Sequence, residues 1–596
     1  MGGEGKTITI EAEGKKVKLQ IGNRLASSDG QTTVMEVAPR IVQGRAFVPL
    51  RFVSEHLGAA VKWDGNTGTA RIFKETLRPL VLGTVRKGGF GTLNPRVADW
   101  LSQSNIEGVT HVGLVKFTPD LKLAPCLAER WEISPEGKAV TFYLRRNAKW
   151  HDGTPVTAED VKFTYEANLK HHFMTNCNLI WEPFFERAEI KDPWTVTCHF
   201  KRPVAYAALL EEAGNYMLPK HIWEDIVATG DPGKATGREL MIGNGPFIFE
   251  RYDPAERIAY LKANPDYFAG KPVLNEVRYK IFDTMDQAVL ALCKGEIDGL
   301  GTYYESVAPA YAEALKKTKG VSLGLTPNTG ISFLLQFNVQ KYPLNLKEMR
   351  EAISLALDYN QLVKMFAGGY GEVPGRGFIP PRVPGHNPEL SRLAYDPEGA
   401  KRILDSLGLV DKNGDGWRDL PTGEKLILAL IPYGSPDELY IRMAEVIASY
   451  LKNVGLNATL DQEVIGNVDK ASKKLHDDKD FWLCVRRAYP MITQVIGGLC
   501  HFVDLGKTKE GIGAWGTSDD PQLQELYFKM LYASNEKEAL EAIRELQDYY
   551  NKTLVGIALS WNELLYPHRI DKYTGWITYP RCPFNYFSWW SLEPAE

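Results

Sequence analysis

The stretch LAPCLAERWEISPEGKAVTFYLRRNAKWHDGTPVTAEDVKFTYEANL, residues 123–169, carries the most informative pattern in the chain. It predicts a strand, a turn, a second strand, a second turn and a helix. Residues 141–144 form a β-prone run directly after the turn residues 135–137. The alternation of β-prone runs with turn residues, followed by a helical segment, indicates a domain that contains both strands and helices.

The helix of this stretch has a predicted start and a predicted apolar face. Thr157 occupies the N-cap position, and Asp160 follows three residues later, where a capping box more often has Glu or Gln. Val161, Tyr165 and Leu169 recur every four residues, which predicts a helix with one buried side. The preceding His-Asp-Gly, 151–153, is interpreted as a turn that satisfies its own backbone rather than as an acid–base pair.

Residues 123–169 resemble the signature region of the bacterial solute-binding protein family that serves peptide and nickel ABC transporters. The resemblance continues, in the same order, through LPKH (218–221), GNGPF (243–247), NPDYF (264–268), GEID (295–298), LQFN (335–338) and REAISLALD (350–358). It implies an α/β, two-lobed periplasmic-binding-protein-like fold of the large three-domain type. A small N-terminal α+β domain is expected in front of it.

The expected division of the chain has four parts. An N-terminal domain covers residues 1–76, and lobe I combines residues 77–119, 241–333 and 558–596. A peripheral domain II covers 120–240, and lobe III covers 334–557. The resemblance implies that the β-prone run 331–338 crosses from lobe I into lobe III and that 557–561 is the returning strand. Two crossing strands would form a hinge that absorbs closure of the lobes.

The composition excludes several classes of protein. Hydrophobic residues make up 44% and charged residues 24% of the chain, as in ordinary soluble domains. The net charge is −4 and no long Lys/Arg run is present, so the electrostatic pattern of a nucleic-acid-binding protein is missing. No apolar run approaches the roughly 20 residues that span a bilayer.

The seven cysteines contain no CxxC pair, and whether Cys177 pairs with Cys198 stays open.

Residues 6–75 resemble the copper amine oxidase N-terminal-like, or stalk, domain. Two hairpins are predicted, at 7–21 and 60–73, with a helix between them, and VPLRFVSEHLGAAVKWD (48–64) is the most specific part. His56 is the only histidine of this segment, and one histidine does not make a copper site. The segment is therefore interpreted as a spacer or as a wall-proximal attachment module, and not as part of an oxidase.

The expected ligand contacts lie late in the chain. Peptide-binding members of the family carry a Trp-x-Ala-Asp-Tyr-like segment whose Asp pairs with the amino terminus of the ligand. The matching stretch here, WLCVRRAYP (482–490), has Ala488 in place of that Asp, preceded by Arg486 and Arg487. A buried amine needs an anionic partner, whereas the planar fork of Arg suits a carboxylate, sulfonate or phosphate. This departure favours a solute with an acidic group.

Further ligand contacts are expected from a second arginine, a histidine and several aromatic residues. Arg376, in the loop GEVPGRGFIPP (371–381), is a second candidate contact for an anion, with an exposed surface residue as the alternative. The nickel-binding branch of the family holds its carboxylate chelators with Arg and a loop His. His501 lies in the corresponding region, away from the matching offset, and is otherwise an ordinary loop or core histidine. The aromatic candidates are Tyr303, Tyr489, Trp515 and Trp561.

The run DKNGDGWRD (411–419) copies the first nine positions of an EF-hand loop. It supplies oxygen ligands at four positions, Asp411, Asn413, Asp415 and Asp419. Thr422 stands at the twelfth position instead of the bidentate Glu. A structural calcium ion and a metal-free turn are both compatible with this pattern, and no other cofactor is expected.

The function expected from the resemblance is that of an extracytoplasmic receptor, at the cell surface or in the periplasm of a bacterium. It would capture a small solute between two lobes by hinge closure and deliver it to the permease of an ABC transporter. The solute is a carboxylate or other anion, a metal chelate or a peptide, and the protein is expected to be monomeric. Attachment to the cell envelope would depend on a leader or lipid anchor that this sequence lacks.

The sequence leaves three alternatives open. They are a nickel–chelator binding protein, an oligopeptide-binding protein, and a surface or sensory binding protein without a role in transport. An enzyme is not expected, because the sequence offers no Ser/His/Asp arrangement, paired carboxylates or metal-hydrolase motif.

Overall fold

The computed structural model describes the chain with the exception of residues 1–5, 13–14, 29, 43–44, 58, 65–68, 75–77, 89–93, 95–105, 107, 172–180, 214, 301–305, 328–330, 435–436, 489–515, 578–587 and 596. The chain folds into two compact units. One consists of Met1–Leu80 with Val273–Glu276, and the other of Val81–Pro272 with Val277–Glu596.

The N-terminal unit is built from hairpins and one short helix. Its antiparallel sheet has the order β1 (Thr7–Ala12), β2 (Lys15–Gln20), β3 (Leu25–Ser28), β4 (Gln31–Val34). The hairpin β5 (Arg40–Val42) and β6 (Arg45–Phe47), helix α1 (Leu50–His56) and the hairpin β7 (Ala59–Asp64) and β8 (Thr69–Lys74) follow. Strand β2 alternates buried Val17 and Leu19 with exposed polar residues, so that one face of the sheet supplies a small core. The two predicted hairpins and the helix between them are confirmed.

In the larger unit, the first sheet draws its strands from distant parts of the sequence. Its order is β16 (Phe247–Asp253), β17 (Ile258–Ala263), β18 (Glu276–Phe282), β9 (Leu80–Val85), β19 (Gly299–Leu300), β28 (His568–Arg569), β20 (Val321–Ser322). The fully buried Asp298 joins three of these segments, because its carboxylate accepts a 2.9 Å hydrogen bond from the Val81 N–H and its carbonyl accepts one of 2.7 Å from the Arg569 N–H. Helices α7 (Met285–Lys294) and α8 (Ala312–Lys317) pack here on a shared core.

The opening stretch of the sequence folds as predicted into strands and a helix. Strands β10 (Val115–Phe117) and β11 (Leu123–Pro125) pair, and a separate sheet has the order β12 (Ala128–Ile133), β13 (Ala139–Leu144), β15 (Thr195–Phe200), β14 (Phe185–Asp192). Helix α3 (Ala158–His171) begins directly after Thr157, whose N–H donates to the Asp160 carboxylate at 2.8 Å. The helices α4 (Trp181–Phe184), α5 (Ala205–Glu212) and α6 (Lys220–Ala228) complete this region.

The His151–Asp152 turn has the structural role that was predicted. The Nδ1 atom of His151 accepts a 3.2 Å hydrogen bond from the Gly243 N–H, and its Nε2 atom lies 3.1 Å from the Gly245 carbonyl. Burial lowers the pKa of His151 to about 4, so the imidazole is neutral. Asp152 accepts the Thr154 N–H at 2.9 Å and lies 2.6 Å from Nε2 of His221. The partner of Asp152 is thus a distant histidine, and His151 is held by backbone groups.

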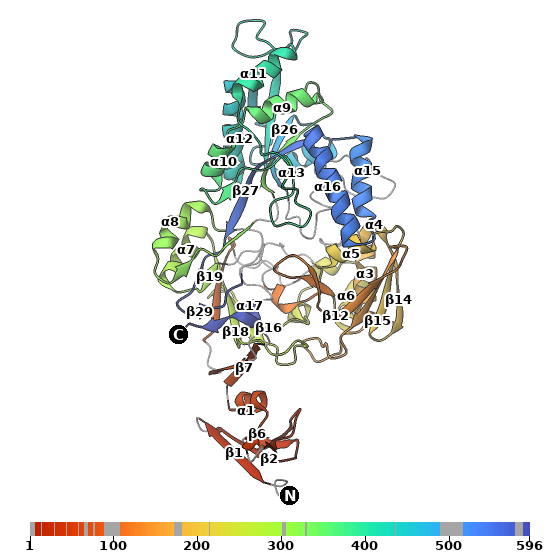
Figure 1. Ribbon diagram of the computed structural model, residues 1–596, viewed down its shortest axis with the longest axis vertical. Helices are drawn as coiled ribbons and strands as arrows, with labels where there is room; N and C mark the ends of the chain where they lie inside the picture. The colour runs from red at the N-terminus through yellow and green to blue at the C-terminus, as the bar shows by residue number, and fades with distance from the viewer. Residues whose placement is uncertain are drawn as a thin grey trace. The chain divides into compact units, whose positions relative to one another are not determined.

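The third sheet contains the two predicted crossing strands. Its order is β21 (Leu325–Pro327), β27 (Gly556–Leu565), β22 (Ile331–Phe337), β26 (Leu483–Ala488), β24 (Ile427–Tyr433), β25 (Asn457–Leu460), and β23 (Gly371–Glu372) pairs with β27. Strands β22 and β27 lie side by side and antiparallel. Figure 1 shows the long β27 leaving the helices α9, α10 and α12 in the direction of β19. The boundaries of the lobes and of domain II stay predictions.

Helices cover both faces of the third sheet. One large core joins it to α9 (Lys347–Leu355), α10 (Tyr359–Phe366), α11 (Pro397–Ser406) and α12 (Asp437–Asn453). The opposite face packs against α13 (Val468–Ser472) and the π-helical turn η4 (Lys473–Asp477). Helices α15 (Pro521–Leu531) and α16 (Glu536–Thr553) pack as a pair. The remaining elements are η1 (Pro232–Lys234), η2 (Arg238–Met241), η3 (Pro309–Tyr311), β29 (Tyr573–Thr574), α17 (Ser588–Ser591) and β30 (Glu593–Pro594).

None of the helices in the described ranges combines the length and the apolar composition that crossing a membrane requires.

Candidate ligand-binding site

The third sheet has a topological switch point at β24. Strand β24 is parallel to both of its neighbours, β25 and β26. Helix α12 connects β24 to β25 on one face, whereas α13 and η4 connect β25 to β26 on the other face. Connections that leave on opposite faces open a crevice at the carboxyl ends of the strands, which is where open α/β sheets bind ligands. Tyr433 and Arg486 are paired at these ends of β24 and β26.

Arg486 is buried at this switch point, with an exposed fraction of 3%. Its Nη1 atom donates to Nε2 of His476 over 3.3 Å, and its guanidinium carbon lies 5.4 Å from the centre of the Tyr433 ring. The rings of Tyr433 and His476 meet edge to face at 5.6 Å. The Nε atom of Arg486 is buried without a hydrogen-bond partner in the described structure. The guanidinium therefore has an aromatic face and a ring nitrogen as neighbours.

Two titratable groups that interact with Arg486, His476 and Cys484, are uncharged at neutral pH. Burial and the charge of Arg486 lower the pKa of His476 to about 4, and its Nδ1 atom lies 3.1 Å from the Ser472 hydroxyl. Burial raises the pKa of the Cys484 thiol to about 12, although the charge of Arg486 acts in the opposite direction. Within the described residues, no carboxylate pairs with Arg486.

An anion would meet a clear need at this position. A buried cation without a counter-charge is costly, and a planar guanidinium is suited to carboxylate, sulfonate or phosphate oxygens. The guanidinium of Arg486, with Tyr433 and His476 around it, is thus chemically suited to an acidic group.

The second predicted arginine, Arg376, already has a partner. Its Nη1 atom donates to Oε1 of Glu351 at 2.8 Å, and its Nη2 atom donates to the other carboxylate oxygen. The Arg376 N–H donates to the Ser391 carbonyl at 2.9 Å. The positive charge of Arg376 is therefore balanced by the carboxylate of Glu351 on α9. The role of Arg376 as a ligand contact stays a prediction.

Trp561, on the predicted crossing strand β27, lines a pocket of about 320 Å³. Trp561 is 7% exposed, and its ring meets His386 edge to face at 5.5 Å. The Nε1 atom of Trp561 and the Oδ1 atom of Asn562 are buried without hydrogen-bond partners in the described structure. The pocket is completed by Pro327, Gly369, Gly371, Glu372, Pro380, Pro381, Arg382 and Glu563. The pocket therefore has an aromatic wall, and two buried polar atoms of its lining residues lack partners in the described structure.

Trp561 and Arg486 belong to the same sheet and are separated by one strand. Leu334 of β22 pairs with Arg486 on one side and with Ala558 of β27 on the other. Trp561 follows Ala558 after three residues on β27. These two predicted contacts thus lie on strands that flank the predicted crossing strand β22.

The oxygens of the EF-hand-like loop are engaged in the turn itself. The Asp411 carboxylate accepts the N–H groups of Gly414 and Gly416 at 2.7 and 2.9 Å. Asp415 forms an ion pair with Lys425 at 2.8 Å. Asn413 accepts the N–H of Asp415, and Asp419 accepts the N–H of Lys412, at 2.9 and 3.0 Å.

These bonds close the loop as a series of side-chain-to-backbone turns. Among the described residues, no group of three or more His, Cys, Asp or Glu side chains is arranged to hold a metal. Calcium binding here stays a prediction.

The other predicted contacts fall outside what the structure describes. Tyr303, Tyr489, His501 and Trp515 lie in segments excluded from the description, and Arg487 is placed on β26 by its backbone alone. Conversely, the sequence pattern does not predict Tyr433 and His476 as neighbours of Arg486. An apolar run that ends in Tyr433 before Gly434 was a signal for the carboxyl end of a buried strand, but nothing in the sequence marks His476.

Two family models match this chain. The model described as bacterial extracellular solute-binding proteins, family 5 Middle, matches residues 122–508, which is more than half of the chain. The model of the copper amine oxidase N-terminal domain matches residues 2–72. The two matches correspond to the two resemblances that the sequence motifs carry.

Curated relatives and solved structures agree with these matches. The dipeptide-binding protein of Escherichia coli is 29% identical over 57% of this chain, and the match spans 63% of that relative, less than two thirds of its length. The periplasmic oligopeptide-binding protein OppA of Salmonella typhimurium is 26% identical over 83% of this chain and 91% of its own. The crystal structure of NikA from Brucella suis in complex with Fe(III)-EDTA superposes with a TM-score of 0.73 and 21% identity, over 86% of this chain and 99% of NikA. The α/β two-lobed fold is thereby confirmed.

Proposed function

This chain belongs to family 5 of the bacterial extracellular solute-binding proteins, and on this premise we propose that it is an extracytoplasmic receptor of an ABC importer. It captures a small solute in the cleft between its lobes and delivers the solute to a membrane permease. The family consists of binding proteins, and the proposed role needs no covalent step. The N-terminal unit would act as a spacer between the receptor and the cell envelope.

The solute is expected to carry an acidic group. The observation that supports this is the buried Arg486, which has no carboxylate partner among the described residues and lies at the carboxyl ends of β24 and β26. An incoming carboxylate, sulfonate or phosphate would replace the hydration that Arg486 lost on burial, through charge-assisted hydrogen bonds. Arg487 follows directly on the same strand and is the next candidate.

A metal chelate is the second candidate solute. Chelators of transition metals are often polycarboxylates. EDTA, in the Fe(III)-EDTA complex of NikA from Brucella suis, is one such chelator. A chelate and a free acid would present the same oxygen atoms to Arg486. An ordinary peptide anchored by its amino terminus is less compatible with the site, because Ala488 supplies no carboxylate for an ammonium group.

Closure would follow from the arrangement of β22 and β27. These neighbouring antiparallel strands are the predicted connections between lobes I and III, so small changes in their backbone angles can rotate one lobe against the other. A solute that contacts both lobes binds the closed form more tightly and shifts the equilibrium towards it.

A thermal-shift screen tests this function directly. The full chain is heated with free organic acids, with their nickel and iron chelates, and with short peptides. A true solute present at about one hundred times its dissociation constant should add roughly 2.7 kcal/mol to the free energy of unfolding. Stabilisation by acids or chelates, but not by peptides with blocked carboxyl ends, is the expected result. Stabilisation by peptides regardless of their carboxyl group would contradict the proposed acidic solute.

A further inference from the structure

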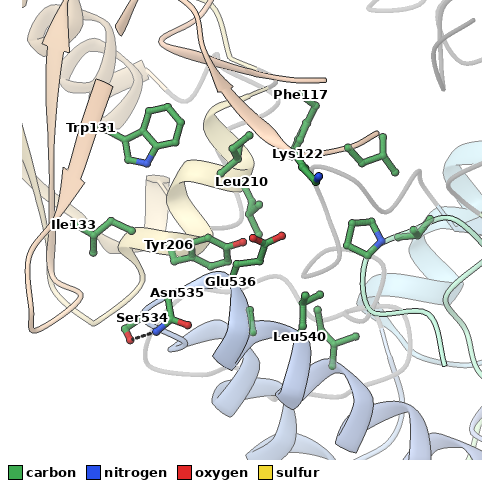
Figure 2. A pocket seen from close by; sticks show the side chains of 16 residues that line it. Phe117, Lys122, Trp131, Ile133, Tyr206, Leu210, Ser534, Asn535, Glu536 and Leu540 are labelled. Atoms are coloured by element: carbon green, nitrogen blue, oxygen red, sulfur yellow. Dashed lines mark hydrogen bonds between the residues drawn. The ribbon is translucent and has the colours of Figure 1, made fainter. Parts of the chain in front are cut away.

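A second pocket, of about 430 Å³, is lined by none of the residues Arg486, Tyr433 and His476. One wall comes from the hairpin β10–β11, strand β12 and helix α5, and the other from Val383, Pro384 and the first turns of α16. Figure 2 shows α16 on one side of this pocket, facing the strands and helix that carry Trp131 and Tyr206. Neither the resemblance nor the proposed receptor function gives this pocket a role.

The walls of the pocket are mainly apolar. Phe117, Leu121 and Ile543 are buried within them, and Trp131, Leu210 and Leu540 are half-buried. The volume falls in the range of roughly 300–1,000 Å³ that is typical of pockets for small organic ligands. The pocket is therefore large enough for a body of one or two rings.

Most polar groups at the pocket are occupied by partners in the protein. Asn535 caps α16, because its Oδ1 atom accepts the Glu538 N–H at 3.1 Å. Its Nδ2 atom donates to the Ser534 hydroxyl at 3.2 Å, as drawn in Figure 2. The Lys122 ammonium pairs with Asp120 at 3.1 Å. These groups are engaged before any ligand arrives.

Two polar groups are left for a ligand, the Tyr206 hydroxyl and the Glu536 carboxylate. Neither has a hydrogen-bond or ion-pair partner within the described residues. Burial, together with the negative charge of Glu536, raises the pKa of the Tyr206 hydroxyl well above its ordinary value. Tyr206 therefore remains a neutral hydroxyl, and the unbalanced charge at this end of the pocket is the negative charge of Glu536. Figure 2 shows the two side chains close together inside the pocket.

We propose that this pocket binds an organic amine, with its apolar body against the walls and its ammonium group between Glu536 and Tyr206. An ammonium group has donors for the carboxylate and for the phenolic oxygen, and it balances the charge of Glu536. The ligand class differs in charge from the acidic solute expected at Arg486. The two sites are therefore distinguished by the sign of the ligand that each prefers.

Three probes of similar shape test this site by isothermal titration calorimetry on the full chain: 2-phenylethylamine, 2-phenylethanol and 3-phenylpropionate. The amine should bind about fivefold more tightly than the alcohol, because an exposed ion pair contributes up to about that factor, and the carboxylate should bind most weakly. Equal affinities for the three probes, or no binding of the amine, would overturn the proposal.

Variants on α16 provide the controls. Glu536→Gln should remove the preference for the amine over the alcohol, whereas Glu541→Gln, an equal change of charge at an exposed position outside the pocket, should retain it. Ala539→Phe should fill the pocket and abolish binding, with circular dichroism to verify its fold, and Leu540→Phe serves if that variant unfolds. A preference that survives Glu536→Gln would refute the assigned site. Arg486→Gln should leave amine binding unchanged, so this result is independent of the proposed receptor function.

Discussion

The guanidinium of Arg376 faces the carboxylate of Glu351 through two hydrogen bonds, one of them 2.8 Å long. The two side chains are only 21% and 22% exposed, and they fasten the loop 371–381 to α9. Arg486, in contrast, has no such partner among the described residues. Arg376 and Arg486 are the two predicted ligand contacts of this type whose side chains the structure describes. Of these two, Arg486 is the one whose positive charge is not already paired with a carboxylate of the described residues.

The Arg376–Glu351 pair should contribute to stability rather than to binding. In a double-mutant cycle of Arg376→Gln and Glu351→Gln, we expect a coupling energy of about 1 kcal/mol, measured by urea unfolding. Each variant should retain the affinity of the wild type for the acidic solute. A loss of binding in Arg376→Gln at unchanged stability would instead place Arg376 in the ligand site.

Asp160 should be essential to the start of α3. It is 4% exposed, and its carboxylate accepts the N–H groups of Thr157 and Lys220 at 2.8 and 2.9 Å. Asp160→Ala removes this carboxylate and leaves the two N–H groups without their acceptor. The free energy of unfolding should therefore fall by about 3 kcal/mol. Glu166→Ala, an exposed change on the same helix, should cost much less. Similar losses for the two variants in chemical denaturation would show that Asp160 does not cap the helix.

The buried His151 should make the protein sensitive to acid. Burial holds its pKa near 4 in the folded state, compared with 6.5 for a free histidine. Between these values the unfolded chain binds a proton that the folded chain does not, so stability should fall as the pH is lowered from about 6.5 to about 4. Urea midpoints across this range should decrease, and less steeply in His151→Gln.

The matched change His56→Gln lies in the N-terminal unit, outside the unit that contains His151, and is the control for the loss of a histidine. A midpoint that stays constant, or that rises on acidification, would contradict the buried neutral state of His151.

The EF-hand-like loop should keep its shape without a metal. The Asp411 carboxylate is held by two backbone N–H groups, and the Asp415 carboxylate is paired with Lys425. We expect the same melting temperature in calcium chloride and in EDTA. A rise with calcium that disappears in Asp411→Asn would contradict this and would establish a structural calcium ion in the loop.

The local features that were predicted correctly from the sequence depend on short-range rules. The start of α3 and the hairpins of the N-terminal unit follow from capping, turn residues and alternation within a few positions. The resemblance to a known family supplied the fold and placed strands at 331–338 and 557–561, because its motifs occur in order over most of the chain. That these strands cross between the lobes stays a prediction. No rule of local periodicity would have paired these two segments.

The surroundings of the candidate site could not be predicted in the same way. The neighbours of Arg486 come from β24 and from η4, and they meet only when the sheet has formed with β24 between β25 and β26. The partner of Arg376 lies on a helix and the partner of Asp152 lies near the start of another, α6. Contacts of this kind are set by tertiary packing, which residue spacing does not encode.

One calorimetric measurement tests the role of Arg486 most directly. It compares the affinities of one acid and of its neutral amide for the wild type and for Arg486→Gln. The acid is the best stabiliser found in the thermal-shift screen. In the wild type the acid should bind at least about tenfold more tightly than the amide, because a charge-assisted hydrogen bond to a buried guanidinium contributes roughly 1.5–3 kcal/mol. In Arg486→Gln the two ligands should bind equally weakly. A wild type that binds the acid and the amide equally, or an Arg486→Gln variant that keeps its preference for the acid, would contradict an acidic solute held by Arg486.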